Sequence, residues 1–400
     1  MNTKKNKFCI VGGGTTSALV LMQILEYCKE PNITCIYDPS IPSIGVGEST
    51  SSSLSKLMQT TLNFLFEKDL PNIDGTIKFA NKYINFGDGD FYTSQQDPAL
   101  HINSSKFSEY VFKRVKEIYD NGVTFVYDNV KSIESVNDYA IIKTNDKEIK
   151  YDYVFDCRGF PKKDELKTDD YDCSFEIPVN SVLLYSEPRF YYEQFYSETT
   201  QTKDGWMFGI PLRTRKTFGY VYNNQITPKE DAIKNFRELK QISDNIELRS
   251  LSWNVFFKRN ICDGNIITLG NRLFFTEPAA ALHLHSIQSL VIVFMELLGT
   301  STYSDGNKIK SIIELESFYN NEVTLLNKIQ LLLLYQTPTN IDSKFWRYAK
   351  EISTRGLIKI TKEEIYKTYD IMNVQAPWAH NKRYFHEFLN GLKVNINNYI

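Results

Sequence analysis

The sequence predicts an α/β fold in which a parallel sheet is joined to an antiparallel sheet and to a helical C-terminal part. Residues 7–50 read as a strand, a glycine turn, a helix and a second strand, the unit from which parallel sheets are built. Two later apolar strands, 151–156 and 266–269, also lead closely into a glycine. The segment 181–222 alternates in polarity and is rich in aromatic residues, which is typical of antiparallel strands.

The composition describes a globular protein with no bias towards charged partners. A chain of 400 residues exceeds the usual size of one core, so two closely packed domains or one large α/β unit are expected. The formal net charge of -2 gives no reason to expect nucleic acid or a membrane surface as a partner. The 26 phenylalanines and 25 tyrosines suit an apolar pocket and equally suit a large core.

The sequence shows no sign of export, membrane insertion or metal binding. Its first residues lead straight into the first strand without a signal peptide, and the apolar runs 290–298 and 329–335 are shorter than the roughly 20 residues that cross a bilayer. The six cysteines lack a C-x-x-C spacing and predict reduced, buried thiols. The five histidines lack the spacing of a metal site. We therefore expect a cytoplasmic protein without a metal.

The glycine turn after the first strand has the pattern of a dinucleotide-binding loop. Gly12, Gly13 and Gly14 stand between the apolar strand 8–11 and a helix that runs to about residue 27. Small residues let the backbone approach a pyrophosphate, and the N–H groups at the start of a helix attract its negative charge.

Two further positions bear on this interpretation. Ser17 takes the place of the third glycine of G-x-G-x-x-G, and Asp38 lies 24 residues after Gly14, where an acidic residue binds a ribose hydroxyl. The alternative is an ordinary strand–helix–strand unit with a tight glycine turn.

The next segments carry residues suited to a ligand site. Residues 44–50 place two glycines beside a carboxylate and hydroxyl groups, a loop that can lie against a flat ligand, and an amphipathic helix follows over 51–68. Lys78 then stands among apolar residues. Such a lysine usually extends to the surface. The alternative is a lysine held in a cavity, where loss of hydration tunes it for chemistry.

The remaining chain is predicted to alternate between sheets and helices. After a helix at 110–119, the strands expected to form a β meander are 124–127, 130–134, 139–144 and 148–151. The strands of 181–222 form a second sheet that covers a pocket. A long helix is expected over about 280–298, and residues 309–400 are largely helical.

Taken together, these segments resemble, in sequence and in order, the flavin-dependent tryptophan halogenase family within the wider group of FAD monooxygenases. The matching segments are GGGTTSA (12–18), IPSIGVGEST (41–50), TIKFANKYINFGDG (76–89), FDCRGF (155–160), GWMFGIPLRTRKTFGYVY (205–222), LGN…EP (269–278) and DSKFW (342–346). The resemblance implies an FAD-binding, Rossmann-like fold of the glutathione-reductase type, with an antiparallel sheet at the substrate region and a helical C-terminal part.

The resemblance also implies an activity. In this family reduced FAD, delivered by a separate flavin reductase, uses O2 to convert bound chloride or bromide into hypohalous acid. A tunnel leads the acid to a lysine, matched here by Lys78, which holds it beside the substrate. The implied function is therefore halogenation of an indole or another electron-rich aromatic compound, and a homodimer is expected on the resemblance alone.

The resemblance assigns two further groups of residues. Those implied to bind FAD are Gly12, Gly14, Thr15, Ser17, Ala18, Asp38, Gly45, Gly47, Glu48, Ser49, Asp156, Gly159, Gly270, Asn271 and Pro278. The W-x-W-x-I-P signature of the family appears here with Trp206, Phe208 and Pro211, which are implied to line the tunnel and the active site. Phe208 replaces the second tryptophan of that signature, and ordinary core packing is the alternative for these rings.

The chain departs from the family after Pro278. Tryptophan halogenases carry a catalytic glutamate there and then a Thr-Gly pair that holds chloride, and alignment on the proline places Ala280 and then Leu282 and His283 at these positions. Alanine has no acid–base group, but the start of a helix attracts anions whatever its side chains. Two alternatives to halogenation therefore stay open: a flavin-dependent monooxygenase or oxidase without a halide site, and a non-catalytic FAD-binding protein.

The predicted domain organisation follows the same segments. A discontinuous FAD-binding module comprises 1–180 and 255–300. An antiparallel sheet over the active site comprises 181–254, and a helical C-terminal region that caps the substrate comprises 301–400.

Overall fold

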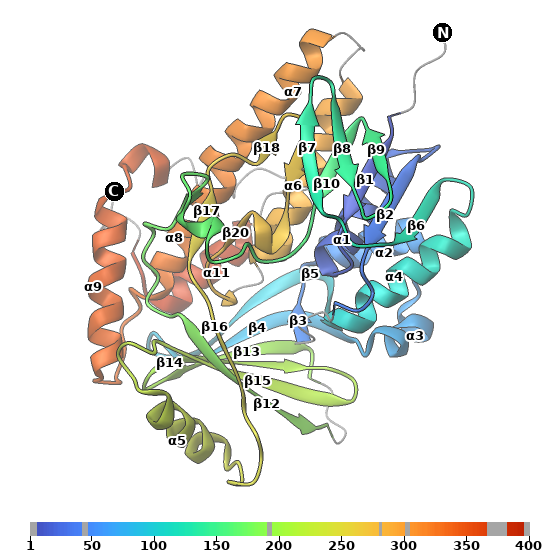
Figure 1. The fold of residues 1–400 in the computed structure, drawn as a ribbon. Coiled ribbons are helices and arrows are strands. Elements are labelled where there is room, and N and C mark those ends of the chain that lie inside the picture. The colour runs from blue at the N-terminus through green and yellow to red at the C-terminus, as the bar shows by residue number, and fades with distance from the viewer. Residues whose placement is uncertain are drawn as a thin grey trace.

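The computed structural model describes residues 6–41, 47–189, 194–279, 282–300, 305–365 and 382–395. A parallel sheet near the N-terminus and a wider, curved sheet lie one above the other in Figure 1, with the C-terminal helices along one side. The α/β fold expected from the sequence is confirmed, with a Rossmann-like sheet, a large mainly antiparallel sheet and a helical C-terminal part.

The parallel sheet has the order β18-β19-β10-β1-β2-β6, in which the edge strand β18 runs antiparallel to β19. Its strands are β1 (Phe8–Val11), β2 (Ile33–Tyr37), β6 (Val123–Tyr127), β10 (Tyr153–Asp156), β18 (Cys262–Asp263) and β19 (Ile266–Thr268). Val11 of β1 is in register with Ile36 of β2 and with Asp156 of β10. The segments that follow the parallel strands therefore meet at one edge, where ligands of such sheets bind.

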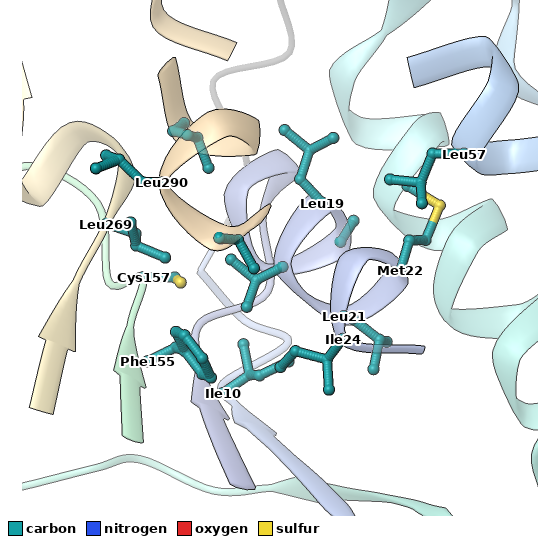
Figure 2. Packing of buried hydrophobic residues seen from close by; sticks show 14 of the residues in the cluster. Ile10, Leu19, Leu21, Met22, Ile24, Leu57, Phe155, Cys157, Leu269 and Leu290 are labelled. Atoms are coloured by element: carbon teal, nitrogen blue, oxygen red, sulfur yellow. The ribbon is translucent and has the colours of Figure 1, made fainter. Parts of the chain in front are cut away.

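The core on one face of this sheet is built around α1 (Thr15–Tyr27), whose residues 17–25 are all buried. Helix α1 is apolar on nearly every side because it packs against the sheet, α2 (Ser52–Leu62), α4 (Ser104–Ile118) and α6 (Leu282–Thr300). Figure 2 shows Met22 of α1 meeting Leu57 of α2, with Ile24 pointing towards Ile10 of β1. By length and hydropathy α6 resembles a membrane span, yet 61% of its apolar window is buried in this core.

The opposite face is covered by a three-stranded meander of β7 (Ser132–Val136), β8 (Tyr139–Lys143) and β9 (Glu148–Tyr151). The expected four-stranded meander was wrong in its first strand, because β6 pairs with β2 in the parallel sheet. The predicted helix over 51–68 is also shorter. Asn63 adopts a left-handed conformation (φ 53°) that ends α2, and a short α3 (Phe66–Asp69) follows.

The wide sheet has the order β16-β12-β15-β14-β13-β4-β5-β3. Its strands are β3 (Gly47–Ser49), β4 (Thr76–Phe86), β5 (Gly89–Asn103), β12 (Ser181–Pro188), β13 (Tyr196–Thr202), β14 (Gly205–Pro211), β15 (Arg215–Tyr222) and β16 (Arg249–Ser252). All neighbours are antiparallel except β13 and β4. The sheet thus contains strands from residues 47–103 as well as the expected 181–254, while the domain boundaries themselves stay a prediction.

The remaining elements connect and cover these two sheets. A small sheet consists of β11 (Tyr171–Asp172), β17 (Phe256–Lys258) and β20 (Phe274–Phe275). The other helices are η1 (Leu70–Ile73), η2 (Glu165–Lys167), α5 (Lys229–Lys240), η3 (Gly270–Arg272), α7 (Asp305–Phe318), the π-helix η5 (Tyr319–Val323), α8 (Thr324–Leu334), α9 (Lys344–Ile358) and α11 (Lys382–Leu392). Helices α8 and α9 share a hydrophobic cluster with the wide sheet, so the C-terminal part closes over that sheet.

Candidate active site

The turn between β1 and α1 forms a cradle at the carboxyl edge of the parallel sheet. Gly12 has φ +131°, and a Cβ there would lie 2.6 Å from the Cys157 carbonyl oxygen and 2.9 Å from Ser17 Oγ. Gly14 is the N-cap of α1, and within the described residues a Cβ on it would meet no atom within 4 Å. No described side chain caps the helix, so its first N–H groups are available to an anion.

The other predicted FAD-binding residues surround this cradle. Thr15 and Ala18 lie in the first turn of α1, and Thr15 Oγ1 donates to Glu48 Oε1 at 3.5 Å. Burial raises the pKa of Glu48 to about 7. Asp38 follows β2 and accepts two hydrogen bonds from Ser40, which lower its pKa. Gly47 and Ser49 belong to β3, while Gly45 lies outside the described residues.

Asp156 and Gly270 both stabilise the structure of this edge. The Asp156 carboxylate lies 2.7 Å from Arg158 Nη2 and 3.0 Å from Arg272 Nε, so it anchors two guanidinium groups. Gly270 (φ +68°) starts η3, and a Cβ on it would lie 2.3 Å from Thr16 Oγ1 of α1. Gly159 has open space at its Cβ position and Asn271 follows Gly270 in η3, and the FAD contacts of these residues and of Pro278 stay predictions.

Lys78 lies in β4 with only 1% of its surface exposed. Its Nζ donates a hydrogen bond to the Thr50 carbonyl oxygen at 3.1 Å, and no carboxylate forms an ion pair with it in the part of the chain that the structure describes. Burial lowers the pKa of Lys78 to about 7, because a charged ammonium is poorly solvated there. The side chain is therefore an inward-facing amine near the end of the GVGEST segment and not a lysine extended to the surface.

His101 joins several predicted site residues and was missed by sequence reasoning. The register places it in β5 between Ser49 of β3 and Thr76 of β4. Thr76 Oγ1 donates to the Pro211 carbonyl oxygen at 2.6 Å, so His101 Nδ1 must donate to Thr76 Oγ1 at 2.9 Å. His101 Nε2 then accepts from Ser197 Oγ at 3.0 Å, and Ser197 Oγ accepts from Ser49 Oγ at 2.9 Å.

This chain of hydrogen bonds requires a neutral His101 with its proton on Nδ1. Burial, followed by the charge of Lys78, holds the pKa of His101 well below its ordinary value, in agreement with that tautomer. No local pattern indicates this network, because only the register of three strands places residue 101 between residues 49 and 76.

A second buried chain involves Trp206 of the predicted tunnel lining. Trp206 Nε1 donates to Tyr335 Oη at 3.2 Å, and Tyr335 Oη donates to Glu277 Oε2 at 2.5 Å. Burial raises the pKa of Glu277 to about 8, and the hydrogen bond from Tyr335 opposes that rise only in part. Phe208 lies 6.2 Å from Trp206 and fills the space above Gly219, where a Cβ would lie 2.1 Å from its ring. Tyr335 was not predicted as a site residue.

Leu282 and His283, the positions that align with the halide-binding pair, lie in the first turn of α6. Leu282 belongs to the same hydrophobic cluster as Trp206 and Tyr335. The His283 ring packs edge-on against Phe274 at 4.8 Å, and burial lowers its pKa to about 4. Both ring nitrogens of His283 are buried without a hydrogen-bond partner among the described residues. Ala280 lies outside those residues, so halide binding there stays a prediction.

The site thus contains two chemically different regions. The carboxyl edge of the parallel sheet offers free helix N–H groups and glycine backbone to a phosphate-bearing ligand. Lys78, His101 and Trp206 supply buried polar groups in the wide sheet. Among the described residues no three histidine, cysteine, aspartate or glutamate side chains gather as metal ligands.

A family model described as tryptophan halogenase matches this chain over residues 7–94 and 88–389. The tryptophan 7-halogenase RebH of Lentzea aerocolonigenes is 20% identical over 437 residues, covering 88% of this chain and 80% of that protein. The tryptophan 6-halogenase ThaL of Streptomyces albogriseolus is 20% identical over 445 residues, covering 92% and 83%.

Solved structures show the same fold. A tryptophan halogenase from Shewanella frigidimarina superposes with a TM-score of 0.79 at 19% identity, covering 98% of this chain and 89% of that one. The flavin-dependent halogenase Xcc4156 from Xanthomonas campestris has a TM-score of 0.77 at 16% identity, with 98% and 89% covered.

Proposed function

Because this chain belongs to the tryptophan halogenase family and is a flavin-dependent enzyme of that type, we propose that it is an FADH2-dependent halogenase. Its substrate is an indole or another electron-rich aromatic compound. The observation that carries the proposal is the buried amine of Lys78, whose pKa lies at about 7 and which faces inward beside Thr50. A structural lysine would instead extend to solvent or pair with a carboxylate.

The carboxyl edge of the parallel sheet fits FAD. The uncapped N-terminus of α1 and the open space at Gly14 suit a pyrophosphate, and Asp38 suits a ribose hydroxyl. Reduced FAD, when bound, supplies with O2 the oxidising power that turns chloride or bromide into hypohalous acid. We further propose that a separate flavin reductase delivers the FADH2, that the protein acts in the cytoplasm and that it forms a homodimer.

Lys78 holds the hypohalous acid in this proposal. With a pKa of about 7, Lys78 is present near neutral pH both as an ammonium, which donates hydrogen bonds, and as a neutral amine, which can also accept one. The reaction then transfers the halogen from oxygen to a ring carbon: the O–X bond breaks, the C–X bond forms, and the ring proton and the hydroxide leave as water. Burial keeps other nucleophiles away from the reagent until this step.

A flavin-dependent monooxygenase or oxidase is the second candidate. The observation that favours it is the sequence after Pro278, where Ala280 has no acid–base group and Leu282 packs in a hydrophobic cluster. In that case the same bound flavin and O2 oxidise a substrate without halide. A non-catalytic FAD-binding protein differs from both because it shows no turnover.

The test compares the wild-type protein with Lys78→Met, which keeps the length of the side chain and removes the amine. FADH2 is supplied by a flavin reductase, and products from indole are measured by mass spectrometry with and without bromide. We expect a brominated product from the wild-type protein and a loss of at least a hundredfold in Lys78→Met, with FAD binding unchanged. The control is Lys82→Met, on the same strand as Lys78, which removes an amine that pairs with Asp90 of β5; this variant should keep its activity.

The outcomes separate the candidates. An oxygenated product that needs no halide favours the monooxygenase, and absence of any product with intact FAD binding favours the non-catalytic protein. Bromination that survives in Lys78→Met contradicts the role given to that lysine.

A further inference from the structure

Ser49, His101, Thr76 and Lys78 lie on one face of the wide sheet. Ser49 of β3 is in register with His101 of β5, and His101 is in register with Thr76 of β4. Residues paired across neighbouring strands share one face of a sheet, and so do residues two apart on the same strand. The pairing of β4 with β5 is regular from Thr76 to Lys78, so Lys78 belongs to this face as well.

Lys78 extends across β5 towards Ser49. The residue opposite Lys78 on β5 is Ala99, whose side chain is a single methyl group. Lys78 Nζ donates to the carbonyl oxygen of Thr50 at 3.1 Å, and Thr50 is the residue after Ser49. The carboxylate of Glu48, the residue before Ser49, lies 3.5 Å from a hydroxyl group of α1. Successive residues of a strand face opposite sides, so Ser49 is turned away from α1 and shares the face of Lys78.

The hydrogen bonds that start at Ser49 run in one direction. Thr76 Oγ1 gives its single proton to the Pro211 carbonyl oxygen at 2.6 Å, so it accepts from His101 Nδ1. A neutral imidazole with its proton on Nδ1 accepts at Nε2, so Ser197 Oγ donates there at 3.0 Å. Ser197 then has no proton left and accepts from Ser49 Oγ at 2.9 Å. The proton of Ser49 is thus committed, and Ser49 Oγ meets any further partner as an acceptor.

His101 is held neutral by its surroundings. Burial is the main cause, and the charges of Lys78, Arg189 and Lys216 add to it, so the pKa of His101 lies well below its ordinary value. The Glu198 carboxylate pairs with Lys216 at 2.8 Å, and in the described part of the chain both ring nitrogens of His101 bond to hydroxyl groups and to no carboxylate. The direction of the hydrogen bonds is therefore fixed at neutral and mildly acidic pH.

Ser49 is the accessible end of this chain of hydrogen bonds. His101 is fully buried and Ser197 is 6% exposed, whereas Ser49 is half-buried. Within the described residues Ser49 Oγ makes no second hydrogen bond. A ligand beside Lys78 that carries an O–H or N–H group therefore finds a free acceptor at Ser49.

We propose that Ser49 Oγ accepts the O–H of hypohalous acid beside Lys78. His101 is the positioning residue that, through Ser197, fixes Ser49 as this acceptor. The inference rests on the proposed halogenase function and adds a second contact to the one made by Lys78. The O–H bond held by Ser49 does not break, because it is retained in the water that leaves when the halogen passes to the ring.

The first measurement reads the tautomer of His101 in the protein without FAD. Nitrogen NMR of protein labelled in its histidines distinguishes a ring nitrogen that carries a proton from one that does not, and the spectrum of His101→Gln identifies the signals. We expect a proton on Nδ1 and none on Nε2, both at pH 7 and at pH 5. A proton on Nε2 would overturn the proposal, whatever the protein catalyses.

The second measurement follows the oxidised halogen in Ser197→Ala, which interrupts the chain and leaves His101 paired with Thr76. The protein receives FADH2 from a flavin reductase together with bromide, indole and taurine, whose amine converts escaped hypobromous acid into N-bromotaurine and water. The ratio of N-bromotaurine to brominated indole should rise about tenfold, because a directed hydrogen bond to the acid is lost. A general loss of structure would lower both products together and leave this ratio unchanged.

Two variants serve as controls for Ser197→Ala. Ser181 is also buried in the wide sheet, and its Oγ lies 2.9 Å from another hydroxyl oxygen, Ser252 Oγ, so Ser181→Ala removes a matched hydroxyl group outside the chain. Its product ratio should equal that of the wild-type protein. Ser197→Thr keeps the hydroxyl group and should restore the wild-type ratio.

The outcomes separate this inference from the proposed function. A wild-type protein that brominates indole, with an unchanged product ratio in Ser197→Ala, would leave the function standing and remove the role of Ser49. An FAD dissociation constant raised about tenfold in Ser197→Ala, measured by calorimetry, would also overturn the inference, because Ser49 would then accept from the flavin. A wild-type protein that forms neither brominated product contradicts the proposed function, and the inference falls with it.

Discussion

Burial shifts the pKa values of Lys78 and Glu277 in opposite directions. Both side chains are buried, and burial penalises whichever form is charged. It therefore lowers the pKa of the lysine to about 7 and raises the pKa of the glutamate to about 8. Near neutral pH both groups hold and release protons without a strongly charged resting state, which suits a site that handles a neutral reagent such as hypohalous acid.

The shift of Glu277 predicts a pH dependence of stability. Its pKa is about 8 in the folded protein and near 4.5 in the unfolded chain, so the folded state binds more protons between these values. The stability that Glu277 contributes is present below about pH 4.5 and is lost as the pH rises through about 8. Relative to Glu277→Gln, the wild-type protein should lose up to about 1.4 kcal/mol for each pH unit in that window.

Urea unfolding of both proteins at pH 5, 6.5 and 8 measures this difference. Glu134→Gln is the control, because Glu134 is exposed on β7 and a hydrogen bond from Lys143 lowers its pKa. A constant difference between the wild-type protein and Glu277→Gln across the three pH values would contradict the raised pKa. Because the pKa of Lys78 is lowered to about 7, its contribution to stability rises with pH above 7, opposite to that of Glu277. The wild-type protein and Glu277→Gln both contain Lys78, so comparing them at the same pH cancels this contribution.

At the scale of single elements, the turn from β1 to α1 separates a folding role from a binding role. A Cβ on Gly12 meets backbone at 2.6 Å and requires φ +131°, so Gly12→Ala should destabilise the protein by a few kcal/mol. A Cβ on Gly14 meets no described atom within 4 Å, so Gly14→Ala should leave the Tm within a few degrees. The same methyl group occupies the space that suits the pyrophosphate, so we expect FAD to bind at least tenfold more weakly.

Calorimetric titration with FAD and thermal unfolding of both variants check this expectation. Wild-type affinity in Gly14→Ala would show that the phosphates lie elsewhere.

The different roles of Gly12 and Gly14 were predictable in part, because the glycine pattern of 12–14 is a local signal. Which of the glycines serves the fold became clear only from the approach of Cys157 after β10, a contact between residues far apart in the sequence.

The difference between local patterns and contacts distant in the sequence explains which elements were predictable. Strands β1, β10 and β19 are short apolar runs that lead into glycines, and β2 follows the helix after the first glycine turn, so each of these strands was predicted from a local pattern. The joining of β4 to β13 could not be read from the sequence, because this parallel pair connects residues 80–84 with 196–200. For that reason Lys78 was identified by resemblance, whereas His101 and Tyr335 were missed: their partners are set by tertiary pairing alone.

On the scale of the whole molecule, the C-terminal helices are bound to the wide sheet by specific contacts. Trp346 of α9 donates to the Thr202 carbonyl oxygen at 2.7 Å, and Thr337 accepts from the Gly87 backbone at 2.9 Å. Ser94 of β5 donates to Glu387 of α11. Lys78 of the wide sheet in turn donates to the Thr50 carbonyl oxygen, and Glu48 of β3 accepts from Thr15 of α1. The C-terminal region, predicted to cap the substrate, therefore packs on the same wide sheet that carries Lys78, while its role as a cap stays a prediction.

This arrangement predicts that the chain unfolds as one unit. Trp346 is almost fully buried in the cluster that joins α8 and α9 to the wide sheet, so Trp346→Ala should cost about 3–5 kcal/mol. If the two sheets and the helices are cooperative, hydrogen exchange should accelerate in β1 and β10 of the distant parallel sheet as well as in α9. Mass spectrometry of exchanged peptides measures both regions in one experiment. Acceleration confined to α8, α9 and the wide sheet would instead show that the parallel sheet unfolds independently, and that β3, β4 and β5 do not belong to the same folding unit as the rest of the predicted module 1–180.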